Sequence, residues 1–325
     1  MTDSGTRVKT IVAFAAVYLI WGSTYLGIRL AVQTMPPFLM AGSRFFVAGL
    51  LLAGWCKWRK EPALSAIEVW QAVGTGVFMF VGGNGLVSWA EQRIPSGLAA
   101  LLVATEPMWL AILLCFGGRG VRPGPMTVGA IVLGLTGVGL LVMHGGDASG
   151  FDALGIGAVL LATVCWTVGS IYAFRIAPVK SASRQLMTQM VSSGLFMALI
   201  GLGMGEGGQM HLAAVSRTSL VAFGYLVVFG SIGAYGAYSY LLRVTTPTKA
   251  ATYAYVNPAV AVFLGWMFQG EPLGGREVAA TAVIVGAVVL LARSSTAASA
   301  EAELAPPPRL LLPEDEPEWC SASVA

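Results

Sequence analysis

Ten uninterrupted apolar runs, separated by short connections, occupy most of this 325-residue chain. A helix of about 20 apolar residues crosses about 30 Å of hydrocarbon, whereas barrel strands alternate in polarity over about ten residues. The runs are continuous, so they predict an all-α membrane protein with ten transmembrane helices. Their bounds are 11–29, 37–56, 67–90, 96–116, 126–143, 153–174, 185–204, 218–241, 248–268 and 277–292.

Composition excludes several other classes of protein. Hydrophobic residues make up 56% of the chain and charged residues only 11%, against about 25% charged residues in soluble domains. The four cysteines have no metal-binding or redox spacing, and no phosphate-binding loop or nucleophile elbow occurs. An intramembrane protease would need paired acids or a Ser/His pair at membrane depth, and the apolar runs contain neither. We therefore expect no enzyme activity, no metal, no cofactor and no nucleic-acid partner.

The basic residues predict the orientation of the chain in the membrane. If residues 1–10 are cytoplasmic, fourteen Lys and Arg residues lie on the inner side and four on the outer side. The positive-inside rule then places both termini in the cytoplasm. Residues 293–325 are rich in Ala, Ser, Pro and Glu, which predicts a disordered acidic cytoplasmic tail.

Two short strings recur in the chain and divide it into related halves. One pair is offset by 147 residues and the other by 151 residues. We expect one five-helix repeat over 11–146 and a second over 153–292. An odd number of helices per repeat inverts the second repeat, and paired inverted repeats place a substrate site near the bilayer midplane. The strings are Gly22-Ser23-x-Tyr25 with Gly169-Ser170-x-Tyr172, and Ala99-Ala100 before Glu106-Pro107 with Ala250-Ala251 before Asn257-Pro258.

Glu106 is the ionisable residue placed deepest in the predicted membrane. A helix beginning at Pro95 carries it roughly 16 Å into the bilayer, close to the midplane. Pro107 follows it and Pro258 follows Asn257, so both helices are predicted to kink there. Polar groups at such kinks persist only against protein or in a water-filled cavity. We therefore predict a central cavity, the alternative being ordinary proline kinks with an acid bonded to a neighbouring hydroxyl.

Other polar and aromatic residues in the runs are candidates for the same cavity. The Arg44 side chain either extends to the outer surface or serves as an anion-binding group or partner of Glu106. Its counterpart in the second half carries no charge. The remaining predicted cavity residues are Trp21, Tyr25, Asn84, Ser88, Trp166, Tyr172, Tyr235, Tyr255 and Asn257.

These motifs, in this order, resemble the EamA-type exporters of the drug/metabolite transporter superfamily. The resemblance rests on Trp21-Gly22-Ser23-x-Tyr25, Arg44-Phe45, Glu106-Pro107, Asn257-Pro258 and Gly270-Glu271, and covers about residues 10–292. It implies an inverted-repeat fold in the bacterial inner membrane and export of small metabolites such as amino acids by alternating access. It also implies a cavity lined chiefly by helices 1, 3, 4, 6, 8 and 9. The two halves differ in one of these motifs. The first-half position that corresponds to Glu271 lies near Arg119, so the acidic turn occurs only in the second half.

The hypothesis is therefore a secondary transporter that exports small zwitterionic metabolites, with opposite charges supplied by Arg44 and Glu106. Its partners are a small-molecule substrate and the lipid bilayer, and the expected state is a monomer or a weak homo-oligomer. Proton coupling and facilitated diffusion both stay open. The alternatives are a membrane-embedded sensor or interaction protein signalling through its tail, and a drug exporter of broad specificity.

Overall fold

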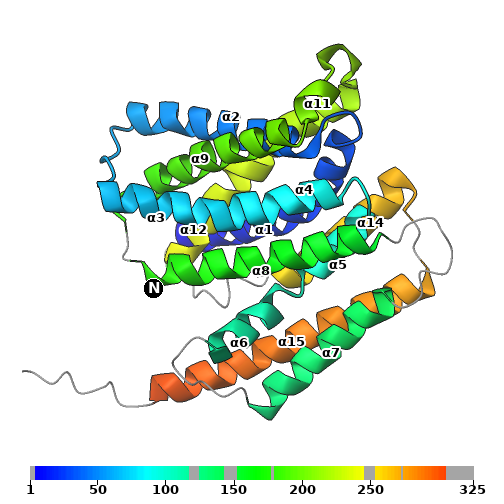
Figure 1. The fold of residues 1–325 in the computed structure, drawn as a ribbon. Coiled ribbons are helices and arrows are strands. Elements are labelled where there is room, and N and C mark those ends of the chain that lie inside the picture. The colour runs from blue at the N-terminus through cyan, green and yellow to red at the C-terminus, as the bar shows by residue number, and fades with distance from the viewer. Residues whose placement is uncertain are drawn as a thin grey trace, which may run out of the picture.

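The computed structural model describes residues 4–116, 124–142, 152–176, 179–244, 253–271 and 274–304, and every regular element in these ranges is helical (Figure 1). The first half contains α1 (Ser4–Ala31), α2 (Pro37–Trp58), α3 (Ala66–Gly76), the π-helix η1 (Val77–Gly85), α4 (Leu86–Ala90), α5 (Ser96–Val103), α6 (Glu106–Phe116) and α7 (Pro125–Val142). The second half contains α8 (Ala153–Arg175), α9 (Ala182–Gly203), α10 (Glu206–Gln209), the 3-10 turn η2 (Leu212–Ala214), α11 (Arg217–Tyr225), the π-helix η3 (Leu226–Gly233), α12 (Ala234–Val244), α14 (Tyr253–Gln269) and α15 (Gly275–Leu304).

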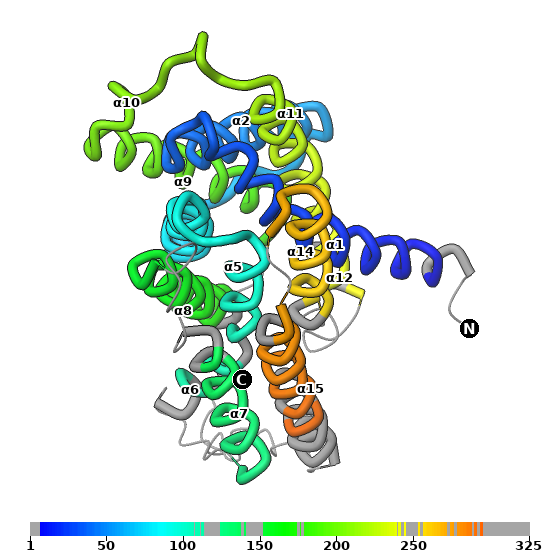
Figure 2. The backbone as a smooth tube through the Cα atoms, turned by 90° about the vertical axis from the view of Figure 1, so that its right-hand side faces the viewer, coloured from blue at the N-terminus to red at the C-terminus, as the bar shows by residue number. Residues whose placement is uncertain are grey.

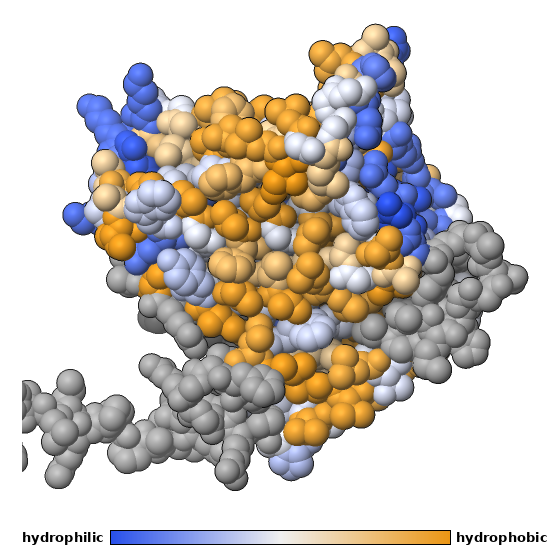
Figure 3. Space-filling model, in the orientation of Figure 1, coloured by the Kyte–Doolittle hydropathy of each residue, from blue (hydrophilic) through white to orange (hydrophobic). Residues whose placement is uncertain are grey.

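These helices confirm the predicted all-α membrane class. Within the described ranges, six helices are long and apolar enough to cross a bilayer, and four shorter apolar helices accompany them. Apolar side chains cover the middle of the face in Figure 3, and hydrophilic side chains gather at both ends. Large apolar residues such as Leu51 and Leu161 are more than half exposed, which suits contact with lipid. The total of ten spans and their orientation stay predictions.

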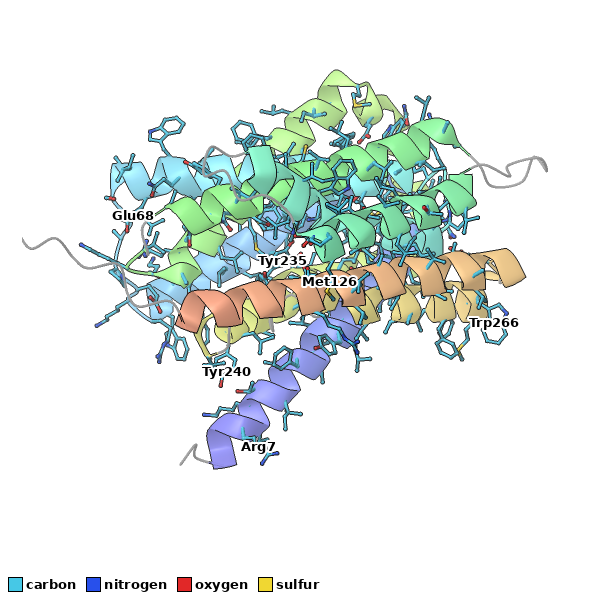
Figure 4. The ribbon with its side chains drawn as sticks, turned by 90° about the horizontal axis from the view of Figure 1, so that it is seen from below. Arg7, Glu68, Met126, Tyr235, Tyr240 and Trp266 are labelled. Carbon is cyan, nitrogen blue, oxygen red and sulfur yellow. The ribbon has the colours of Figure 1, made fainter. Side chains whose placement is uncertain are left out.

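The helices are arranged in layers. α2 and α9 lie side by side at one edge, and α7 and α15 pack together at the opposite edge with α6 (Figures 1 and 2). α1, α5, α8, α12 and α14 lie between them. The N-terminal part of α1 leaves the bundle, so that Arg7 lies away from the other helices (Figure 4). A site at the centre of this arrangement draws residues from both halves.

Glycines allow α2 and α9, the most extensively contacting pair of described helices, to meet backbone to backbone. A Cβ atom on Gly42 would lie 2.8 Å from the backbone nitrogen of Ala198, and one on Gly194 would lie 2.5 Å from that of Phe46. Small residues permit such close approach in membrane proteins. The pair joins the first half to the second.

The two π-helical segments occupy matching places in the two halves. η1 and η3 begin 149 residues apart, at Val77 and Leu226. π-helical turns are rare and frequently lie at functional sites. On η1, Gly82 and Gly83 have no side chain, so Cys165 and Trp166 of α8 approach closely. This contact places η1 beside the centre of the bundle.

Two glutamates that are distant in sequence satisfy the N-termini of helices that begin after a proline. The Glu206 carboxylate accepts hydrogen bonds from the backbone nitrogens of Phe38 (3.2 Å) and Leu39 (2.8 Å) at the start of α2. The Glu271 carboxylate accepts from the Ser96 nitrogen and hydroxyl (both 2.8 Å) and from the Gly97 nitrogen (3.1 Å) at the start of α5. A carboxylate also complements the positive end of the helix dipole. The Gly270-Glu271 motif therefore ties the segment before α15 to α5.

Replacing Glu271 with alanine is expected to lower the free energy of unfolding by about 0.5–2 kcal/mol, the usual cost of losing a helix cap. Thermal unfolding of the detergent-purified protein measures the change. Gln92→Ala, at an exposed position near the start of α5, serves as the control and should leave the melting temperature unchanged. Equal effects of the two substitutions would contradict the capping role.

Among the differences from the sequence predictions, two change how the helices are described. The predicted helix 96–116 is interrupted at Ala104 and Thr105, between α5 and α6. α15 continues to Leu304, beyond the predicted end at residue 292 and into the segment predicted as a disordered tail. The extension is rich in Ala and Glu, which have high helix propensity. The acidic run of the predicted tail lies outside the described residues.

Candidate functional site

A cavity lies at the centre of the bundle, between the two halves. The space within it that the centres of water molecules can occupy is about 80 Å³. A single water needs about 10–15 Å³ by the same measure, so the cavity is large enough for several. Figure 4 shows Tyr235, one of its lining residues, inside the bundle. The lining residues are Trp21, Thr24, Tyr25, Ile28, Arg44, Gly83, Asn84, Val87, Val103, Glu106, Ala162, Thr163, Trp166, Tyr235, Tyr253 and Asn257.

Most of the predicted cavity residues meet here. Trp21, Tyr25, Arg44, Asn84, Glu106, Trp166, Tyr235 and Asn257 all line the cavity.

Two predicted residues are not among its lining residues. Ser88 is buried, but its hydroxyl donates to the backbone oxygen of Asn84 one turn earlier (2.8 Å). Tyr172 is 37% exposed, and a Cβ on Gly74 of α3 would lie 3.4 Å from its ring. The side chains of Tyr255 and Pro107 lie outside the described residues, and Pro258 is inside α14.

Arg44 is a buried cation with a free donor. Only 2% of the residue is exposed, so its side chain does not extend to the surface. Its Nε donates to the Ser231 hydroxyl at 2.9 Å, and its guanidinium carbon lies 4.7 Å from the centre of the Phe45 ring. Its Nη1 has no hydrogen-bond partner among the described residues. A desolvated guanidinium with an unused donor is suited to bind an anionic group.

Glu106 begins α6, directly after the interruption of the fourth predicted helix. Its Oε2 accepts a hydrogen bond from the Tyr253 hydroxyl at 3.3 Å. Pro107 is the second residue of α6, where a proline needs no amide hydrogen and is tolerated. Among the described residues no cation lies within ion-pair distance of Glu106, so it does not neutralise Arg44. The cavity therefore holds a guanidinium group and a carboxyl group that are not paired with each other.

Asn257 and Gly22 bring α1 against α14. In the orientation that its surroundings favour, the Asn257 amide donates to the backbone oxygens of Tyr18 (3.1 Å) and Tyr253 (3.2 Å). A Cβ on Gly22 would lie 2.7 Å from the Cβ of Val260. Both recurring strings thus contribute to the contact between these helices, which forms one wall of the cavity.

Aromatic rings form the apolar part of the lining. The centre of the Trp21 ring lies 4.9 Å from that of Tyr253, and 5.1 Å from those of Tyr235 and Tyr238. The Tyr253 hydroxyl reaches Glu106, and the Tyr235 hydroxyl accepts from the Asn84 amide at 3.3 Å. The rings therefore supply an apolar surface whose polar ends hold the cavity's acid and amide.

Sequence reasoning missed Tyr253, Thr24 and Thr163. Tyr253 lies four residues before Asn257, so both fall on the same side of α14. Thr24 and Thr163 are buried, and their hydroxyls bond to backbone oxygens within their own helices. Within the described ranges, no group of three His, Cys, Asp or Glu residues could hold a metal ion.

Comparison with known proteins identifies similar transporters. The EamA-like transporter family model matches residues 8–143 and 153–293. The chain is 38% identical over 297 residues to the uncharacterized inner membrane transporter YedA of Escherichia coli (strain K12), covering 90% of this chain and 94% of that protein. It is 23% identical over 282 residues to a Salmonella typhimurium protein named "Probable amino-acid metabolite efflux pump", covering 84% and 91% of the two chains. A solved crystal structure has the same fold with a TM-score of 0.60 at 18% identity, covering 91% of this chain and 99% of that one.

Proposed function

Because this chain belongs to the EamA-like transporter family, we propose that it exports small zwitterionic metabolites, amino acids foremost, by alternating access. The observation that carries the proposal is the presence of Arg44 and Glu106 on one central cavity without an ion pair between them. A relative with 23% identity carries the name of an amino-acid metabolite efflux pump. The chain itself is a membrane transporter.

The lining offers a complementary group for each part of an amino acid. The unpaired Nη1 of Arg44 is suited to donate a hydrogen bond to the carboxylate of the substrate. Glu106 is suited to the ammonium group, which also gains from the faces of nearby aromatic rings such as Tyr253. Trp21 and Tyr235 provide apolar surface for a side chain. The cavity thus favours a molecule that carries both charges over a purely cationic drug.

The halves provide the moving parts of the cycle. Residues lining the cavity come from both: Gly83 and Asn84 belong to the π-helical segment η1, and Tyr235 follows the second one, η3, at the start of α12. Inverted repeats commonly rock about a fixed central site. We place the protein in the bacterial inner membrane with both termini in the cytoplasm, as the basic residues predict.

Efflux from proteoliposomes loaded with a panel of labelled amino acids tests the proposal. Glu106→Gln keeps the shape of the side chain but removes its charge, so efflux of zwitterions is expected to fall at least about tenfold. Tyr172→Phe, outside the cavity, is the control and should keep the wild-type rate. Unchanged efflux in Glu106→Gln would exclude charge pairing with the substrate. A wild-type protein without transport, whose phenotype depends on its tail, would favour the sensor hypothesis.

A further inference from the structure

Glu91 is a buried acid that the cavity does not use. It directly follows the candidate span Ala66–Ala90, and none of its surface is exposed. Neither carboxyl oxygen has a hydrogen-bond partner among the described residues. The guanidinium of Arg29 donates from Nη1 to the backbone oxygen of Glu91 rather than to its carboxyl group.

The ionisable groups around Glu91 compensate its negative charge only in part. Arg29 and Tyr25 face it from α1, Arg44 faces it from α2, and Glu271 faces it from the segment before α15. Glu271 carries the same charge and is bonded to the start of α5. None of these cations forms an ion pair with Glu91 in the described part of the chain.

The exposed acid at this end of the bundle behaves differently. Arg93, two residues after Glu91, pairs with Asp152 at 2.6 Å. This hydrogen bond holds the pKa of the Asp152 carboxyl below its usual range. Asp152 is therefore ionised at neutral pH and provides a matched comparison with Glu91.

A carboxyl group in the position of Glu91 is stable as the neutral acid. A buried carboxylate without donors loses its hydration, and the attraction of Arg29 and Arg44 offsets that loss only in part. Burial raises the pKa of the Glu91 carboxyl well above its usual range, and the neighbouring Glu271 raises it further. The ionised form needs water, which reaches Glu91 only if the surrounding helices separate.

Hydrogen bonds within the first half and between the halves hold this end together in this structure. The Arg29 bond to Glu91 joins α1 to the end of α4. Two side-chain pairs at the same end of α1 connect it to the second half, namely Gln33 Nε2 to Gln269 Oε1 at 3.0 Å and Thr34 Oγ1 to Ser219 Oγ at 2.8 Å. This end, predicted to be the outer one, is therefore closed around Glu91.

We propose that Glu91 is a proton-binding site that controls the outer end of the transporter. Uptake of a proton from the outer solution, with formation of one O–H bond on the carboxyl group, closes this end. Return of that proton to the outer solution leaves the carboxylate and opens it. The proposal rests on the proposed export function, and it predicts that acid outside slows release of substrate. A proton antiporter would respond in the opposite direction.

Efflux from loaded proteoliposomes at fixed internal pH, with the outer pH varied from about 5.5 to about 8.5, tests the site. Wild-type efflux should rise at least about threefold toward alkaline pH. Glu91→Gln resembles the neutral acid, so it should give a slow rate that does not depend on pH. Asp152→Asn, which removes the exposed acid, should keep the wild-type profile. A wild-type profile in Glu91→Gln, or faster export in acid, would overturn the proposal.

Thermal unfolding in detergent provides a readout that does not depend on transport. When folding raises the pKa of an acid, the folded state loses stability as the pH rises above the pKa that the acid has in the unfolded state. Glu91→Gln should therefore match the wild-type melting temperature in acid and exceed it at alkaline pH. Equal melting temperatures at every pH would overturn proton binding at Glu91. A protein with this stability difference but no export would retain the proton site and lose the proposed function.

Discussion

Arg44→Gln is expected to reduce export of zwitterionic substrates about ten- to a hundredfold, the range given by loss of one hydrogen bond to a charged group. Arg44 lines the cavity, and its buried Nη1 donor has no hydrogen-bond partner among the described residues. Arg44→Lys should fail similarly, because an ammonium group cannot reproduce the planar fork that also holds Ser231. Initial efflux rates in proteoliposomes measure both effects.

A substrate-binding role and a structural role for Arg44 predict different stabilities. An incompletely partnered buried charge is costly, so Arg44→Met should leave the melting temperature unchanged or raise it while export is lost. A marked fall in melting temperature would indicate that Arg44 holds the fold together. Arg93→Gln removes an exposed arginine outside the cavity and should keep its export rate.

Gly42→Val is expected to prevent assembly of the folded transporter. Its added Cβ would lie 2.8 Å from the Ala198 nitrogen and 2.9 Å from the Gly194 oxygen, both backbone atoms that cannot rotate away. Overpacking costs about 1–3 kcal/mol even where side chains can adjust, so the loss here should reach at least that range. The yield of monodisperse protein and its melting temperature report the effect.

Gly54→Val is the matched control for this substitution. Gly54 lies on the same helix, α2, and a Cβ there would meet no atom within 4 Å. Both substitutions change the helix propensity of α2 in the same way, so only the contact with α9 differs. Equal yields and melting temperatures for the two variants would contradict the close backbone contact.

The sequence predicted the helical class and much of the cavity because both depend on local patterns. It could not decide between the two positions of the Arg44 side chain, since only the packing of Ser231 and Phe45 around the guanidinium selects the buried one. Glu91 was overlooked for a related reason. It lies at the end of an apolar run, where acids are usually solvated, and tertiary contacts alone bury it.

Tyr172 shows the limit of reasoning from repeated strings. Trp21 and Tyr25 are four residues apart, which leaves them about 40° apart around the helix axis. Trp166 and Tyr172 are six residues apart, which leaves them about 120° apart around the helix axis. Trp166 faces the cavity, so Tyr172 is directed elsewhere and packs beside Gly74. The string recurs in the second half, but the spacing between the tryptophan and the tyrosine does not.

The paired π-helical segments also determine which way the residues on them and after them face. A π turn contains one more residue than an α turn, and the family model matches both halves. Each half therefore carries its extra residues at a corresponding place, in η1 and in η3. Deleting one residue from either segment would rotate the following part of that helix by about 100°. Asn84 or Tyr235 would then turn away from the centre, so the lining of the cavity depends on both irregular turns.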